Sequence, residues 1–274
     1  MGSMIAAELF KLRKRPMTWW MLGIMAAITT LVFTVSYQIG HHSTNPSTAR
    51  SALDNALLPK GARTAVSAGN ALWGTLTVIA IAVVVGNEFQ YGTLRTQLAM
   101  GLRRIPYVLS KAIAVFLAAI IGLVIVVAFG VGLSVLLTAV DGAPMTWSGA
   151  FGQEFWQTLG VQALGTATRF ALALFITLLA RQVVAGVAVV LGYTILEGTL
   201  TSLLTGFGGG WAKAVNFFLT PNQRALAYGL DRSQNFNKAL FSVPVAAMLL
   251  IAYAIIFLIV SVVIFNRRDV KGAA

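Results

Sequence analysis

The sequence predicts an all-α integral membrane protein with six transmembrane helices, on three observations: composition, apolar segments and the placement of basic residues. Of its 274 residues, 58% are hydrophobic and only 10% are charged, and the mean hydropathy is +0.82. Soluble domains carry about 25% charged residues, so this composition is typical of a membrane protein. Residues 1–3 are expected to be an expression scar, and residues 4–274 are expected to form a single transmembrane domain.

Six segments are apolar and approach or exceed the ~20 residues that cross the hydrocarbon core of a bilayer. They are residues 17–39, 70–86, 107–137, 155–180, 183–205 and 243–265. The third is longer than one crossing needs, so it must tilt or project beyond the membrane. Only Arg181 and Gln182 separate the fourth segment from the fifth, which predicts adjacent antiparallel helices.

The distribution of Lys and Arg predicts that both termini are cytoplasmic. Segments on the side of the termini carry twelve of these residues over about 48 positions, and the other side carries seven over about 84. Short cytoplasmic loops are enriched in Lys and Arg. The net charge of +12 therefore indicates loops beside anionic lipid rather than a nucleic-acid partner. We expect a bacterial plasma (inner) membrane location.

Helical segments at the membrane surfaces are also predicted. Ile5, Leu9 and Leu12 share one helical face, and Pro16 ends the run. The basic residues of this segment lie mostly off that face: Lys11, Arg13, Lys14 and Arg15. This pattern predicts either an amphipathic helix on the inner leaflet or a plain basic flank of the first span.

The outer loops are predicted to differ from one another. Residues 206–242 predict short interfacial helices before the last span, because Thr220–Gln223 has the pattern of a capping box with proline at the first helical position. Residues 40–69, rich in Ser, Thr, Asn and Pro, predict a soluble loop.

No catalytic or metal-binding pattern is recognised. The chain has no cysteine, and the pair His41-His42 has no carboxylate at ligand spacing, so we expect a solvated pair and no metal. Gly86 and Gly92-Thr93 do not have the spacing or the lysine of a phosphate-binding loop. We therefore expect no enzyme activity and no cofactor on this chain.

Two charged residues lie deep inside predicted spans, Arg169 in the fourth and Glu197 in the fifth. A charge near mid-bilayer costs about 2.5–3.5 kcal/mol on insertion scales, so each needs a partner. At 1.5 Å per residue from the turn at residues 181–182, their heights are about 18 and 22 Å. An intramembrane Arg169–Glu197 pair is predicted, either structural, lining a transport path, or moving during opening.

The stretch between the second and third spans, residues 86–104, is polar but has an apolar stripe. Its members recur at helical spacing: Tyr91, Leu94, Leu98, Leu102 and Ile105. This predicts a cytoplasmic helix over about 88–102, which is too short to be stable alone in water. The stripe therefore needs a neighbour, either the protein's own membrane face or a separate partner.

The whole pattern resembles the membrane subunits of ATP-binding cassette (ABC) exporters of the type-2 permease class. The resemblance rests on Glu88, Gly92-Thr93, the basic pair Arg103-Arg104 and Lys111 before a long span, together with the basic N-terminal helix and the six spans. It implies that the 88–102 helix is a coupling helix seated on a separate ATPase subunit. The contacts so implied are Glu88, Tyr91, Gly92, Thr93, Leu94, Arg95 and Leu98.

The same resemblance implies a unit of two permeases, as a homodimer, and two ATPases that bind ATP and Mg. The path for an exported substrate, whose class the sequence does not define, would run between the second and fifth spans of the two copies. Two other functions fit the sequence. One is a proton- or ion-coupled secondary transporter using Arg169 and Glu197; the other is a non-transporting subunit that passes ATPase motions to another protein.

Overall fold

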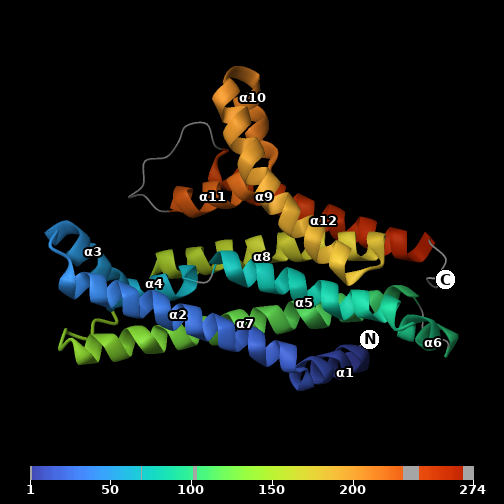
Figure 1. The fold of residues 1–274 in the computed structure, drawn as a ribbon, viewed down its shortest axis with the longest axis horizontal. Coiled ribbons are helices and arrows are strands. Elements are labelled where there is room, and N and C mark those ends of the chain that lie inside the picture. The colour runs from blue at the N-terminus through green and yellow to red at the C-terminus, as the bar shows by residue number, and fades with distance from the viewer. Residues whose placement is uncertain (1, 69, 101–103, 231–240, 268–274) are drawn as a thin grey trace. The chain divides into compact units, whose positions relative to one another are not determined.

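The computed structural model describes residues 2–68, 70–100, 104–230 and 241–267, and every regular element among them is helical (Figure 1). The helices are α1 (Gly2–Lys14), α2 (Pro16–His42), α3 (Pro46–Ala56), α4 (Lys60–Ser67), α5 (Asn70–Gln90), α6 (Thr93–Ala99), α7 (Arg104–Val140), α8 (Gln153–Ala180), α9 (Val183–Phe207), α10 (Gly209–Ala214), the 3-10 turn η1 (Val215–Phe217), α11 (Leu219–Leu230) and α12 (Val243–Arg267).

Among the described residues, six helical segments are long and apolar enough to cross a membrane, in agreement with the six predicted spans. Five coincide with α2, α7, α8, α9 and α12, and the second candidate, Lys60–Gln90, covers α4 and α5. Each observed helix extends a few residues beyond its predicted span, because polar residues at the ends continue the helical hydrogen bonding. The longest, α7, has 37 residues, about 55 Å at 1.5 Å per residue.

The chain packs as two compact units. Unit 1 contains Met1–Lys14, Gly74–Ala118 and Leu164–Ala274, and unit 2 contains Arg15–Trp73 and Ala119–Ala163. A single transmembrane domain over residues 4–274 stays a prediction.

Residues 40–69, predicted as a soluble loop, instead contain two helices of unit 2, α3 and α4. Helix α3 begins at Pro46 because the Asn45 side chain accepts a hydrogen bond from the Ser47 amide (3.1 Å). Helix α4 buries small residues against α7, and a Cβ on Gly130 would lie 2.7 Å from that of Ala65. Small residues let helix backbones approach closely in membranes. The polar composition of residues 40–69 hid the small residues that make this contact possible.

The core of unit 1 is built from α1, α5, α6, α7, α8, α9 and α12, all of which contribute to one cluster of buried apolar residues. Two close approaches fix its helices. A Cβ on Gly86 of α5 would lie 2.8 Å from the backbone nitrogen of Val183. Gly186, one turn later on α9, is equally tight against Thr177 of α8. Glycine is required at both places because no side chain fits.

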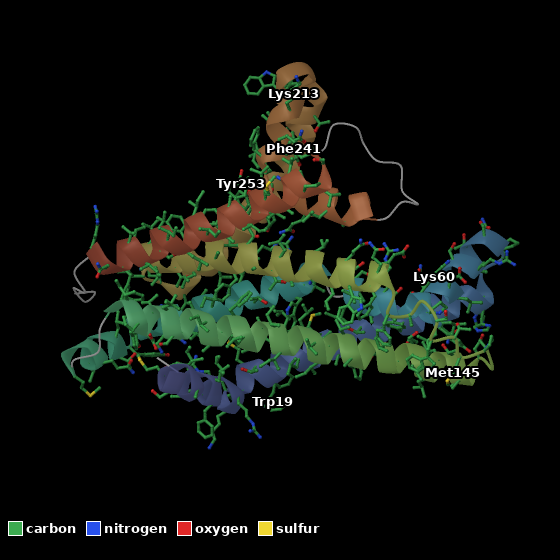
Figure 2. All side chains as sticks on the ribbon, turned by 180° about the vertical axis from the view of Figure 1, so that it is seen from behind. Trp19, Lys60, Met145, Lys213, Phe241 and Tyr253 are labelled. Carbon is green, nitrogen blue, oxygen red and sulfur yellow. The ribbon has the colours of Figure 1, made fainter. Side chains whose placement is uncertain are left out.

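Between α9 and α12 the structure contains two short helices, α10 and α11; their place at the outer membrane interface stays a prediction. Tyr253, labelled in Figure 2, lies on α12. Its hydroxyl donates to the Phe217 carbonyl (2.7 Å), which fixes the turn η1. Asn222 closes the same turn, donating to the carbonyls of Asn216 and Phe218 at 2.6 and 2.7 Å. The predicted capping box is wrong, because α11 begins at Leu219 and residues of its first turns bond to α8 and α9, as described below.

Candidate functional site

The corner between α5 and α7 holds the predicted coupling segment (Figure 1). Helix α5 continues to Gln90, so Glu88 belongs to its last turn rather than to a separate helix. Gly92 has φ +66°, a left-handed conformation that glycine adopts without strain and that ends the helix. Helix α6 then runs from Thr93 to Ala99. The predicted single helix over 88–102 is therefore corrected to the end of α5, a turn and the shorter α6.

The residues of the predicted stripe do not share one surface. Leu94 is buried and joins the core of unit 1, whereas the Tyr91 side chain is 76% exposed in the turn. Ile105 lies on α7, not on α6. The side chains of Arg95 and Leu98, and residues 101–103, lie outside the described part of the chain. The corner therefore buries Leu94 within the protein and leaves Tyr91 and Thr93 on the surface.

A buried cluster of charges lies beside this corner, within unit 1. Lys111 is 3% exposed, and its Nζ lies 2.9 Å from Glu8 Oε1 and in contact with Glu88 Oε1. The Tyr107 hydroxyl donates to the other oxygen of Glu88 (2.7 Å), and Lys111 also lies over the Tyr107 ring, 4.8 Å from its centroid. Glu8 bonds a second lysine, Lys11, at 2.8 Å. The cluster therefore joins α1, the end of α5 and the start of α7.

Each charge in the cluster depends on the others. Taking a charge out of water costs several kcal/mol, which is offset only by a paired and hydrogen-bonded partner. Burial raises the pKa of Glu8, but hydrogen bonds and attraction from Lys11 and Lys111 outweigh it, so the pKa lies below its ordinary value of 4.5. Glu8 is therefore ionised at neutral pH. The cluster, with Lys11 included, holds two carboxylates and two ammonium groups.

Helix α1 follows the predicted amphipathic pattern but has a protein neighbour. Leu12 is part of the unit 1 core, and Ile5 and Leu9 pack against it. The basic side chains of Lys11 and Lys14 stay exposed, and Lys14 Nζ lies 4.7 Å from the centre of the Phe10 ring. The predicted apolar face therefore contacts protein, and its contact with the inner leaflet stays a prediction. The remaining members of the predicted basic set are Arg13, which is exposed, and Arg15, which is partly buried.

The sequence indicated Lys111 as a loop charge and as the lysine before the long third span, but not as the centre of a charge cluster, and it did not identify Glu8 or Tyr107 at all. Lys111 lies two turns inside α7, which begins at Arg104. Two signals were present: Glu8 is the single acid of a basic helix, and Lys111 precedes 57 residues without a Lys or Arg. A lysine at the start of an apolar helix and an acid at the end of the previous one are natural partners.

Arg169 and Glu197, predicted to pair with each other, both bond to α11 in the structure. Arg169 Nη2 donates to Gln223 Oε1 (2.5 Å). Glu197, 1% exposed, accepts from the backbone amide and the hydroxyl of Thr220 at 2.6 and 2.7 Å. The two charges remain close enough to interact electrostatically. A direct Arg169–Glu197 bond stays a prediction, and the structure gives both residues a role in holding α11.

The contact of Glu197 with Thr220 is a helix cap supplied from another helix. The first amides of a helix have no partner within it, and an unpaired amide is costly away from water. The negative charge of a carboxylate at this end also interacts favourably with the positive end of the helix dipole. On the other side, Arg169 fits only because α5 has a glycine there: a Cβ on Gly74 would lie 2.6 Å from Nη1.

The histidine pair of unit 2 is not simply solvated. His41 Nε2 lies 2.8 Å from Asp141 Oδ1, and the Tyr37 hydroxyl donates to the same oxygen at 3.3 Å. These contacts join the end of α2 to the end of α7. No group of three metal-ligating side chains is found among the described residues.

The described helices define a multi-pass integral membrane protein. A family model described as ABC-2 family transporter protein matches residues 4–197, and the chain belongs to this family. The match runs from α1 into α9 and includes Glu8, Glu88, Lys111, Arg169 and Glu197. Comparison with individual curated proteins gives no match. Membership makes the chain a permease, the membrane subunit of an ABC transporter.

Proposed function

We propose that the chain is the permease of an ATP-driven exporter, working as a homodimer in a bacterial inner membrane with both termini in the cytoplasm. ATP and Mg bind a separate ATPase subunit, which docks on the corner formed by the end of α5, the turn at Gly92 and α6. Membership of the ABC-2 family supports a permease that relies on a separate subunit for ATP hydrolysis. The exported substrate is not identified by these features.

The observation that carries this proposal is the corner itself. A seven-residue helix, α6, lies between two long apolar helices, and the turn before it presents Tyr91 to the surface. Leu94 anchors α6 in the unit 1 core and Glu88 is fixed by Lys111, so a force on α6 is passed to α5 and α7. A rigid, exposed corner of this kind suits an ATPase contact.

Transport then follows as a shift between conformations. Closure of the ATPase dimer on ATP displaces α6 and tilts the helices attached to it. This shifts the equilibrium between the inward-facing and outward-facing states of the path. Energy enters through differential binding of ATP to the two states, not through chemistry on this chain. Helix α9 leaves large apolar side chains exposed, among them Ile195 and Phe207, which supports contact with a second copy as well as lipid.

Co-purification with the ATPase tests the docking site. Tyr91→Asp places a charge on the exposed turn without disturbing the core and should lower ATPase recovery at least tenfold, a loss of about 1.4 kcal/mol of binding. Trp211→Asp, at an exposed aromatic position on α10, is the control and should retain the ATPase. Equal recovery with both variants would show that the ATPase binds elsewhere.

Flux measurements separate the two alternative functions. Gradient-driven transport by the permease without any ATPase would indicate the secondary transporter. ATP hydrolysis that responds to the permease while no candidate substrate moves would indicate the non-transporting subunit. Both oxygens of Glu197 accept hydrogen bonds from Thr220, which supports a structural role for this carboxylate over the ion-coupling role that a secondary transporter would give it.

A further inference from the structure

One polar contact between α1 and the rest of unit 1 runs through the Glu8 side chain. Glu8 is buried, and its carboxylate contacts Lys111 of α7 at 2.9 Å. Lys111 in turn contacts Glu88, four residues before the turn at Gly92. A continuous chain of buried ionic contacts therefore leads from α1 to the corner that precedes α6.

The two acids of this chain are not equivalent. Glu88 has a second bond, from the Tyr107 hydroxyl at 2.7 Å, so it stays tied to α7 if Glu8 is lost. The second bond of Glu8 is to Lys11 of its own helix, whose side chain is 49% exposed. Loss of the Glu8 charge therefore removes the contact of α1 with Lys111 but leaves the Lys111–Glu88 pair intact.

Apolar contacts alone do not fix the position of α1. The core includes Leu12, and Ile5 and Leu9 pack against it. Such apolar contacts are non-directional. A buried ionic bond has a defined geometry, because departure from it leaves charges without partners. Glu8 thus sets where α1 sits along α7.

We infer that Glu8 is a positioning residue that ties α1 to the α5–α6 corner through Lys111, so that α1 moves together with α6. The inference rests on the proposed docking of an ATPase at this corner. It makes the N-terminal helix part of the moving machinery instead of a static flank. Release of the tie would let α6 move while α1 stays behind.

Spin-label distances in the full complex test this inference, and the absence of native cysteine makes single-pair labelling straightforward. Labels are placed at exposed positions, Ala6→Cys on α1, Thr96→Cys on α6 and Asn266→Cys on α12. Three pairs report separate quantities: 6–96 the tie, 96–266 the motion of α6, and 6–266 the motion of α1. Labelled chains are diluted with the cysteine-free wild type, so that pairs within one chain dominate.

The permease alone is measured first. The wild type should give one narrow 6–96 distance, and Glu8→Gln should lose it to a broad distribution. The matched control is Lys11→Gln, which removes the exposed partner of Glu8 and should remain narrow. The 96–266 distance should be unchanged in both variants. An unchanged 6–96 distance in Glu8→Gln, equal broadening in Lys11→Gln, or broadening of 96–266 would each overturn the positioning role.

The ATPase complex, trapped with ATP and vanadate, is measured second. In the wild type both the 96–266 and the 6–266 distances should shift; in Glu8→Gln only 96–266 should shift. A 6–266 shift of wild-type size in Glu8→Gln would overturn the inference. If trapping shifts no distance in the wild type, the proposed docking site fails, while the 6–96 result still decides whether the tie exists.

Discussion

Lys111 carries one positive charge between two carboxylates, Glu8 on α1 and Glu88 on α5. The arrangement makes the lysine much harder to replace than either acid. Removal of one acid leaves a paired lysine, but removal of the lysine leaves two buried carboxylates facing each other. Breaking a buried pair from one side costs about 3–5 kcal/mol.

Lys111→Gln should therefore lower the free energy of unfolding by about 3–5 kcal/mol. Lys11→Gln removes an exposed partner of the same glutamate and should cost no more than about 1 kcal/mol. Denaturant unfolding in detergent micelles measures both. Equal losses in the two variants would mean that burial of Lys111 has no energetic consequence.

The sequence allowed these residues to be predicted only in part. Glu88 was identified from its position before Gly92-Thr93, and Glu197 and Arg169 from their isolation in apolar spans. Their partners were missed, because Glu8, Lys111 and Gln223 are brought in by packing between distant segments. Local sequence patterns do not indicate which of several buried charged residues form contacts with one another.

At the scale of elements, helix α11 is attached to its neighbours by charged side chains from two other helices. Glu197 of α9 caps its first turn and Arg169 of α8 bonds Gln223 one turn later. The sequence predicted a helix here but assigned its cap to its own residues. A buried carboxylate from outside replaced the local capping box, since it satisfies both the amide and the hydroxyl of Thr220.

Glu197→Ala should release the start of α11, because the Thr220 amide loses its acceptor; an N-cap is worth about 1 kcal/mol. Amide hydrogen exchange in residues 219–223 should accelerate by about fivefold or more for that free-energy change. Thr199→Val is a suitable comparison, because Thr199 bonds only the Ile195 carbonyl of its own helix. Unchanged exchange at Thr220 in Glu197→Ala would contradict the cap.

At the scale of the whole molecule, the six spans were predictable because about 20 apolar residues are a physical requirement of the bilayer. Six candidate spans are found among the described residues. The helices α3 and α4 were missed, because their polar composition hid the small residues that pack α4 on α7. Composition reports the average environment of a segment, whereas packing depends on single positions such as Gly130.

The orientation of the chain is testable by chemical labelling. With both termini inside, a membrane-impermeant maleimide on intact cells should label Ser47→Cys on α3 and Gly210→Cys on α10. It should not label Thr96→Cys or Asn266→Cys until the membrane is opened, because Lys- and Arg-rich segments stay in the cytoplasm. The reverse pattern would invert the topology and exclude an ATPase contact at α6.

The contact of Gly86 with the first residue of α9 has a mechanical consequence. The α5 and α9 backbones nearly touch there, so they can pivot about this point but cannot approach further. Helix α9 has 25 residues and extends about 36 Å beyond the pivot. A rotation of about 3° about this contact would displace the far end of α9 by about 2 Å, so a small change of angle beside the α5–α6 corner would become a larger displacement at the opposite end of the helix.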